Sequence, residues 1–259
     1  MRTALTIAGS DSGGGAGIQA DLRTFQAHGV FGTSAITAVT AQNTLGVRAV
    51  QALDPGIITA QIDAVAEDFI ISSVKIGMLA NAEIVRAVAA GLDRHGLQPI
   101  VLDPVMIAKG GDALLAPDAV AALRAELIAR ATIVTPNLSE AEVLTGRTIT
   151  TVAAMRVAAA DLLSAGARAV VIKGGHLDGP AIDLFADATL SEELSAPRLA
   201  TAHTHGTGCT FASAIAARLA LGDDLLSAVR RAKAYVHRAI ELAPRLGHGH
   251  GPLGTPDRP

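Results

Sequence analysis

Short apolar runs alternate with longer segments of helical periodicity along most of this chain. That alternation predicts parallel β-strands joined by crossover helices, which is the pattern of an α/β fold. Most of the runs are apolar throughout, as expected of strands that helices cover on both faces. The predicted strands span residues 4–8, 34–40, 47–52, 74–76, 100–102, 133–135 and 169–172, with two weaker strands near an edge at 181–184 and 193–196.

The segments between these strands carry apolar residues at helical spacing, so each helix should pack one face onto a central, mostly parallel sheet. The chain has 259 residues, no internal repeat and no linker-like shift in composition, which favours one domain over residues 1–259. Its last segment, 248–259, is rich in Gly, His and Pro and predicts a partly flexible tail. The predicted helices span 18–28, 57–68, 83–94, 118–129, 152–164, 207–221 and 224–242.

The net charge and the cysteine content limit the binding partners and the cellular compartment that can be expected. The formal net charge is -3 and the basic residues are scattered, so no nucleic-acid partner is expected. The single cysteine, Cys209, cannot close a bridge within the chain, which favours a reducing, cytoplasmic setting. The start of the chain lacks a signal-like apolar segment, and the most apolar helix candidate is interrupted by Arg218. No membrane association is expected.

A Gly-rich segment, residues 9–17, follows the first predicted strand and opens a helix, where the backbone can approach a ligand closely. It is not a Walker A loop, because no Gly-Lys-Ser/Thr follows. It also misses the dinucleotide fingerprint, because Ile18 stands where the final Gly is required. We therefore predict a binding loop of another kind, with a flexible turn as the alternative.

A second Gly-rich segment, residues 205–210, again precedes a helix and could direct free peptide N–H groups at an anion. The positive end of that helix should favour the thiolate of Cys209 and give it the character of a proton acceptor. The alternative is that Cys209 is a small buried hydrophobic residue.

Polar residues follow three further strands, and adjacent strand ends are ligand sites in open α/β sheets. Asp103, Asn137 and Glu140 offer oxygen ligands of the kind that Mg²⁺ prefers. Alternatively, Asn137 merely caps a helix whose first turn Glu140 completes. Lys173 offers a point charge to a phosphate, unless it is a solvated strand end. A zinc site is not expected, since no cysteine or carboxylate completes a zinc-like spacing among the histidines at 203, 205, 248 and 250.

Seven stretches together resemble the bacterial hydroxymethylpyrimidine/phosphomethylpyrimidine kinases, over nearly the whole chain. They read AGSDSGGGAGIQADLRTF, TAVTAQNT, KIGML, LDPVMIAKGG, TPNLSEAEVL, KGGHL and THGTGCTFASAIA. The resemblance implies a ribokinase-like three-layer fold, usually as a homodimer. It also implies that ATP, with Mg²⁺, phosphorylates the hydroxymethyl group of 4-amino-5-hydroxymethyl-2-methylpyrimidine. A second phosphate would then be added to the monophosphate, and the product would feed thiamin biosynthesis.

The resemblance also assigns residues to a site. The Gln42 amide offers an acceptor beside a donor, which matches the edge of an aminopyrimidine, and Met78 offers soft apolar contact with the ring. By position, the pyrimidine pocket would comprise Gly9, Ala16, Asp21, Gln42 and Met78. The metal and nucleotide side would comprise Asp103, Glu140, Asn137, Lys173 and Thr207. The anion hole would comprise Gly206, Thr207 and Gly208, with Cys209 as the catalytic base.

One departure from the family, one candidate flap and two rival functions accompany this interpretation. The first Gly-rich loop has Ser12-Gly13 where the family often has Pro-Ser or Ser-Ser. This loop is therefore expected to be less stiff than in the family. Residues 107–115 resemble a mobile flap around Lys109. The rival functions are a pyridoxal or pyridoxine kinase and a catalytically inactive sensor of thiamin precursors.

Overall fold

One sheet runs through the computed structural model, which describes residues 1–107, 114–175 and 179–256. Across those ranges the sheet has nine strands in the order β3-β2-β1-β4-β5-β6-β7-β8-β9. Most of the predicted flap lies outside the described residues. The strands are β1 (Thr3–Asp11), β2 (Phe31–Asn43), β3 (Gly46–Ala52), β4 (Ile71–Ile76), β5 (Ile100–Leu102), β6 (Ile133–Val134), β7 (Ala169–Gly174), β8 (Ala181–Asp187) and β9 (Ser191–Ala196).

The centre of the sheet is parallel and both of its edges are antiparallel. Strands β2, β1, β4, β5, β6 and β7 pair in parallel, whereas β3 pairs antiparallel with β2. On the other side, β8 and β9 continue the sheet with antiparallel pairs. The predicted mostly parallel sheet is confirmed. Its parallel strands end along one edge, where ligand sites form in such sheets.

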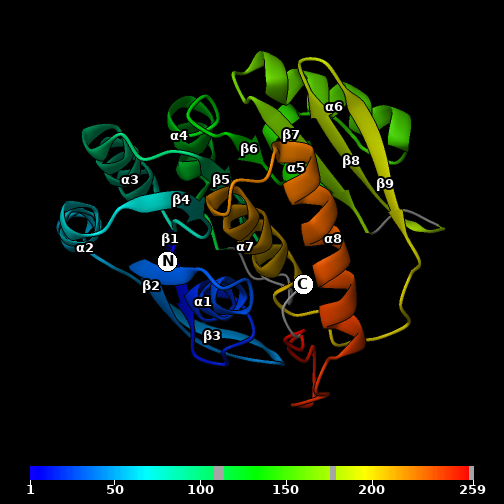
Figure 1. Cartoon of the computed structure of the whole chain (residues 1–259), viewed down its shortest axis with the longest axis horizontal. Helices are drawn as coiled ribbons and strands as arrows, with labels where there is room; N and C mark the ends of the chain where they lie inside the picture. Colours follow the sequence, from blue (N-terminus) through cyan, green and yellow to red (C-terminus); the bar gives the residue numbers. More distant parts are fainter. Residues whose placement is uncertain (108–113, 176–178, 257–259) are drawn as a thin grey trace.

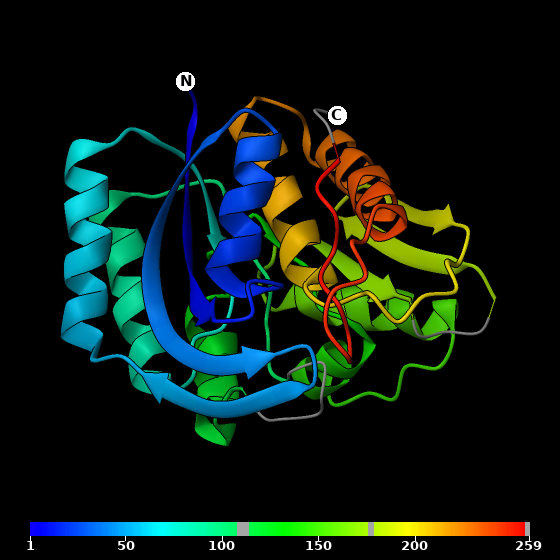
Figure 2. The ribbon, with the colours of Figure 1, turned by 90° about the horizontal axis from the view of Figure 1, so that it is seen from below.

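Helices cover both faces of the sheet (Figures 1 and 2). Alternate residues of one strand point to opposite faces, and the two cores follow this period. Ile100 and Leu102 join the core beneath α2 to α6, while Val101 joins the core beneath α1, α7 and α8. The helices are α1 (Gly17–Ala27), α2 (Pro55–Asp68), α3 (Ala82–His95), α4 (Pro117–Glu126), α5 (Leu138–Thr145), α6 (Val152–Ser164), α7 (Thr207–Ala220) and α8 (Leu225–Glu241).

The predicted elements are present, with differences at their ends. β1 continues to Asp11, beyond the predicted strand end at residue 8, although Gly9 and Ser10 are turn-type residues. Pairing with β2 on one side keeps this segment extended. The short helix α5 was anticipated only in the alternative interpretation of Asn137 and Glu140. Among the described helices, none has the length and apolarity needed to cross a bilayer.

The C-terminal segment, up to residue 256, packs closely onto the turn between β2 and β3. The His250 N–H donates to the Thr44 carbonyl over 2.8 Å. A Cβ added at Gly249 would lie 2.1 Å from the same carbonyl oxygen, so only glycine permits this approach. On its other side, the segment accepts the His205 N–H at the Gly251 carbonyl. The last three residues, 257–259, lie outside the described part of the chain.

Two adjacent glycines at the end of β7 provide a test of the antiparallel edge. A Cβ at Gly174 would lie 2.0 Å from the Ile182 carbonyl oxygen of β8, whereas a Cβ at Gly175 would meet nothing within 4 Å. We expect Gly174→Ala to lower the free energy of unfolding by about 2 kcal/mol or more, because the backbone of β8 must move. The matched control, Gly175→Ala, should stay within about 0.5 kcal/mol of the parent. Equal urea midpoints for the two variants would contradict the predicted clash.

Candidate active site

A cavity of about 570 Å³ opens along the edge where the parallel strands end. Nearly every residue that the sequence proposed for the site lines this cavity, although they come from segments that are far apart in the chain. The exception is Asp21, which is fully buried and does not line it. The proposed residues that line the cavity are Gly9, Ala16, Gln42, Met78, Asp103, Asn137, Glu140, Lys173, Gly206, Thr207, Gly208 and Cys209.

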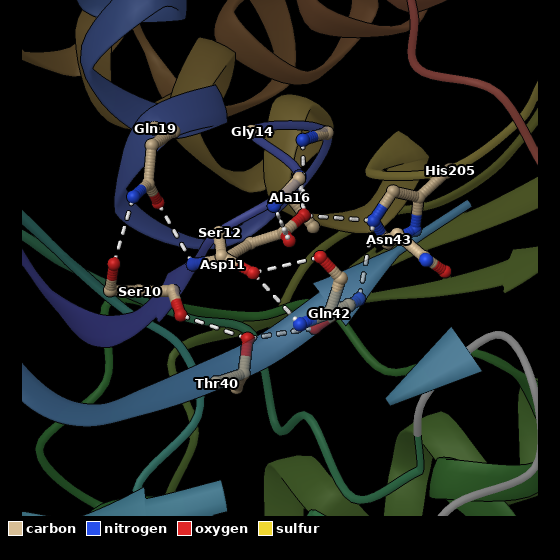
Figure 3. A network of polar contacts seen from close by, with 12 residues as sticks. Ser10, Asp11, Ser12, Gly14, Ala16, Gln19, Thr40, Gln42, Asn43 and His205 are labelled. Atoms are coloured by element: carbon tan, nitrogen blue, oxygen red, sulfur yellow. Dashed lines mark hydrogen bonds and ion pairs between the residues drawn. The ribbon is translucent and has the colours of Figure 1, made fainter. Parts of the chain in front are cut away.

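The first Gly-rich segment is closed around the carboxylate of Asp11 (Figure 3). Oδ1 accepts the N–H of Gly13 at 2.8 Å, while Oδ2 accepts those of Gly15 at 3.0 Å and Ala16 at 2.8 Å. His205 Nε2 lies 2.9 Å from the same Oδ2. Burial alone would raise the pKa of Asp11, but the hydrogen bonds from His205 and from these peptides hold the pKa below its ordinary value. The loop is therefore fixed from within, unlike the flexible turn of the alternative interpretation.

The two Gly-rich segments touch, and two glycines make that contact feasible. A Cβ at Gly15 would lie 2.2 Å from Cδ2 of His205, and a Cβ at Gly206 would lie 1.9 Å from the Gly15 carbonyl oxygen. Gly206 also has a φ of 82°, in the left-handed region that favours glycine. The end of β1 and the start of α7 are thus held in direct contact.

The start of α7 supplies an anion-binding arrangement. Gly206 is the N-cap residue and provides no side chain to satisfy the first turn. Within the described residues, the N–H groups of Gly208 and Cys209 have no protein acceptor. A Cβ at Gly208 would lie 3.2 Å from Lys173 Nζ and 3.5 Å from Asp103 Oδ2, so the free peptides lie beside these charged groups. A phosphoryl group placed here would meet peptide N–H donors and a helix N-terminus.

The surroundings of Cys209 do not favour the expected thiolate. Burial raises the pKa of the Cys209 thiol to about 11, with the carboxylates of Asp21 and Asp103 acting in the same direction. The Lys75 ammonium lowers the pKa, but not by enough to offset burial. The prediction was wrong because it counted the helix N-terminus and could not count the desolvation of the sulfur. Cys209 is therefore a neutral thiol at neutral pH.

Asp103, Lys173 and Glu140 form a charged cluster at the ends of β5 and β7 and the start of α5. Lys173 Nζ donates to Asp103 Oδ1 over 2.8 Å. Burial alone would lower the pKa of Lys173, but Asp103 and Glu140 raise it. Burial also raises the pKa of Glu140 to about 7, with Lys173 opposing the shift and Asp103 adding to it. Two buried carboxylates therefore share one lysine in this cluster.

The donor set fits Mg²⁺ better than a metal held by protein ligands alone. In the described ranges no group of three or more His, Cys, Asp or Glu side chains could hold a metal. Mg²⁺ usually binds through one or two carboxylates, with phosphates and waters completing its octahedron. Asp103 and Glu140 supply that number of carboxylates at the cavity wall.

The alternative in which Asn137 caps a helix and Glu140 completes its first turn is confirmed. The Asn137 side chain accepts the N–H of Glu140 at 2.9 Å, and Glu140 Oε2 accepts the N–H of Asn137 at 2.7 Å. This reciprocal capping box starts α5. Because both residues also line the cavity, the capping box holds the Glu140 carboxylate at a fixed place in the wall.

Asp21 supports the cavity from beneath. Its carboxylate accepts hydrogen bonds from Lys75 Nζ at 2.9 Å, Thr6 Oγ1 at 2.7 Å and Ser213 Oγ at 2.7 Å. Burial alone would lower the pKa of Lys75, but the charges of Asp21 and Asp103 raise it, so Lys75 stays protonated. Asp21 thus fixes a buried cation in the cavity wall, close enough to Cys209 to influence its thiol.

Sequence reasoning missed three members of the site. Lys75 is the only charged residue in an otherwise apolar or small strand, and its place near the strand end was a usable signal. Asp11 ends β1 at the start of the Gly-rich segment. His205 was named only as the first residue of the second Gly-rich segment and as a candidate metal ligand. Its contact with Asp11, 194 residues away in the chain, left no local signal.

The sheet order, the helix N-terminus at the cavity and the acidic residues at neighbouring strand ends define a small-molecule kinase of the ribokinase-like class. The family model for phosphomethylpyrimidine kinase matches residues 11–254. A hydroxymethylpyrimidine/phosphomethylpyrimidine kinase of Rhizobium meliloti (strain 1021) is 55% identical over 254 residues, which cover 96% of this chain and 95% of that protein. The chain belongs to the phosphomethylpyrimidine kinase family.

Solved structures agree with this placement. A phosphomethylpyrimidine kinase from Clostridium difficile 630 has a TM-score of 0.83 and 45% identity, covering 93% of this chain and 100% of that one. An ADP complex of a Bacillus subtilis pyridoxal kinase has a TM-score of 0.93 and 38% identity, covering 99% of this chain and 98% of that one. The predicted ribokinase-like fold is confirmed.

The buried Lys75–Asp21 pair yields a test of how the cavity floor is held. Lys75→Met should lower the free energy of unfolding by about 3–5 kcal/mol, because it leaves the Asp21 carboxylate buried without a cation. Lys75→Met/Asp21→Asn should recover much of that loss, since the uncompensated charge is gone. One of the Thr6 and Ser213 hydroxyls keeps an oxygen acceptor, and the other can accept from the new amide NH₂. Urea unfolding measures both. Strictly additive effects of the two substitutions would contradict a direct pair.

The protonation state of Cys209 can be followed by alkylation. Because only the thiolate reacts, and the pKa is raised to about 11, the alkylation rate of the unliganded protein should rise about tenfold per pH unit through pH 9 to 10. The same cysteine in urea-unfolded protein, with an ordinary pKa of about 8.5, should level off sooner. A rate in the folded protein that levels off near neutral pH would contradict the neutral thiol.

Proposed function

We propose that the protein phosphorylates the hydroxymethyl group of 4-amino-5-hydroxymethyl-2-methylpyrimidine with ATP, and then adds a second phosphate to the monophosphate, in thiamin biosynthesis. One cavity holds an amide suited to an aminopyrimidine edge, Gln42, together with the phosphoryl-binding start of α7. That juxtaposition carries the proposal, and the identity to the Rhizobium meliloti kinase supports it. We treat residues 1–259 as a single kinase domain.

The pyrimidine would bind between Gln42 and Met78, near Gly9. A Cβ at Gly9 would lie 3.0 Å from Met78 Sδ, so any side chain at residue 9 would press on the thioether that faces the ring. Ala16 lines the cavity and its N–H is held by Asp11, which keeps the loop against the ring site. In this proposal Asp21 positions Lys75 rather than touching the pyrimidine.

ATP would place its phosphates between the start of α7 and the charged cluster. The free N–H groups of Gly208 and Cys209 would stabilise charge that develops on the transferred phosphoryl group. Asn137, Lys173 and Thr207 would contact the nucleotide. Asp103 and Glu140 would hold Mg²⁺, which neutralises phosphate charge when bound. Lys173, now paired with Asp103, is positioned to share its charge with a phosphate.

Only the thiolate of Cys209 would accept the proton of the hydroxymethyl group, so the thiol would first lose its own proton to solvent. Its thiol is neutral in the unliganded site, and phosphoryl transfer depends mainly on positioning and electrostatic stabilisation. The contribution of Cys209 as a base should therefore fall at the low end of general-base effects, which begin at about 100-fold. Lys75 is the cation that favours the thiolate during the reaction.

The two transfers should differ in their need for this base. The first removes a hydroxyl proton, whereas the second begins from a phosphate oxygen that is already anionic. Cys209→Ala should slow the first phosphorylation by about 100-fold and the second far less. Single-turnover assays of each step, with Cys209→Ser as a control for volume, measure this. Equal losses in both steps would count against Cys209 as the base.

A homodimer and a cytoplasmic setting complete the proposal. Apolar side chains are exposed on β2, α2 and the segment before β4, among them Phe31, Ile57 and Ile70. Phe31 stacks on Phe69 with ring centroids 6.0 Å apart, which gives this surface a defined shape. Such a patch is typical of a protein interface. Sedimentation velocity should give twice the mass of one chain, and a single-chain mass at micromolar concentration would oppose a dimer.

Pyridoxal phosphorylation is the second candidate, because a pyridoxal kinase of Bacillus subtilis shares the fold with a TM-score of 0.93. Purified protein should be assayed for ATP consumption with the pyrimidine alcohol and with pyridoxal, and the products identified by mass. Sequential mono- and diphosphorylated pyrimidine is the expected result. Phosphorylation of pyridoxal alone would overturn the substrate assignment, and no product from either alcohol would favour the precursor-binding sensor.

A further inference from the structure

The side chain of Gln42 lies against His205 on one side and Thr40 on the other (Figure 3). Gln42 Nε2 is 3.3 Å from His205 Nε2, and Gln42 Oε1 is 3.2 Å from Thr40 Oγ1. His205 belongs to none of the roles assigned above, yet its ring is buried between the two Gly-rich segments. Its other contacts determine which hydrogens it presents to Gln42.

Asp11 fixes a hydrogen on His205 Nε2. Asp11 Oδ2 already accepts two peptide N–H groups, and a carboxylate can only accept. At 2.9 Å from that oxygen, His205 Nε2 must therefore donate. The other neutral tautomer would place a nitrogen lone pair against an anionic oxygen. A doubly protonated ring would carry the same hydrogen on Nε2.

With that hydrogen in place, the Gln42 amide is mismatched on both sides. Its NH₂ group faces a second N–H donor at His205. On the other side, the single hydroxyl hydrogen of Thr40 is shared between Gln42 Oε1 at 3.2 Å and the Ser10 carbonyl at 3.0 Å. Turning the amide by half a rotation removes the contact between two donors. Oε1 then shares the Nε2 hydrogen of His205 with Asp11 Oδ2, while Nε2 donates to Thr40, whose hydroxyl still donates to Ser10.

We propose that His205, held by Asp11, is a positioning residue that fixes the Gln42 amide with its oxygen toward His205 and its nitrogen toward Thr40. This inference rests on the proposed function only for the identity of the ligand. In this orientation the Gln42 amide can bind the edge of the ring in one direction only. An exocyclic amine is recognised on the His205 side, and a ring nitrogen is recognised on the Thr40 side.

The chemistry of the proposed substrate agrees with that direction. In the aminopyrimidine alcohol, the amine at C4 neighbours the hydroxymethyl group at C5, and the ring nitrogen N3 lies on the amine's other side. His205 immediately precedes the anion-binding start of α7. An amine on the His205 side therefore carries the hydroxymethyl group toward the phosphoryl site. Pyridoxal has an aldehyde oxygen in place of this amine, so it would set an acceptor against Gln42 Oε1.

Two substitutions of His205 separate this role from simple packing. The amide nitrogen of glutamine reaches the position of His Nε2, whereas that of asparagine reaches only the position of Nδ1. Relative to the parent, His205→Asn should weaken binding of the pyrimidine alcohol by roughly tenfold or more. His205→Gln should retain most of the affinity. The KM for ATP should change little in either variant, and the preference for the pyrimidine over pyridoxal should fall in His205→Asn only.

Titration calorimetry without nucleotide, KM measurements and ¹⁵N NMR of the histidine ring test the proposal together. A protonated, pyrrole-like Nε2 of His205 in the unliganded protein is expected. An unprotonated Nε2, or equal affinity of the Gln and Asn variants for the pyrimidine alcohol, would overturn the proposal. If the parent protein bound no pyrimidine alcohol, the proposed function would fail instead, while the NMR result would still decide the state of His205.

Discussion

The carboxylate of Asp11 is the contact on which the geometry of the cavity depends. It collects three peptide N–H groups of the loop that follows β1, and it meets His205 from the segment before α7. Leaving any buried polar group of this arrangement without a partner would cost free energy. Loss of one contact should therefore weaken the others. One side chain therefore joins the Gly-rich loop after β1 to the helix that would bind the phosphoryl group.

Buried charge is the second constraint. Several buried charged side chains lie together in the site. Lys75 with Asp21, and Lys173 with Asp103, place two ion pairs at the ends of the parallel strands. Buried ion pairs contribute little net stability compared with apolar packing, so their presence here is better explained by chemistry than by folding. The pKa of Glu140, raised to about 7 by burial, and that of Cys209, raised to about 11, show the same low-polarity setting. Such perturbed groups gather at functional sites.

Much of the fold could be predicted from the sequence, because buried parallel strands have a strong local pattern. The run 100–102 was predicted with the bounds of β5, and helix 152–164 with those of α6. Residues at strand ends were likewise predictable, because the carboxyl ends of parallel strands meet at one edge. The sequence did not predict properties of the site that depend on burial or on contacts between residues far apart in the chain. The thiol of Cys209 depends on desolvation, the place of Asp21 depends on Lys75, and the role of His205 depends on Asp11.

The central claim is that one cavity reads an aminopyrimidine at Gln42 and presents its hydroxymethyl group to the start of α7. A crystal structure with the pyrimidine alcohol and a non-hydrolysable ATP analogue tests this most directly. The account predicts the ring between Gln42 and Met78, with the hydroxymethyl oxygen directed at Cys209 and the γ-phosphoryl group against Gly208. A ring bound away from Gln42, or terminal phosphates remote from the N-terminus of α7, would contradict it.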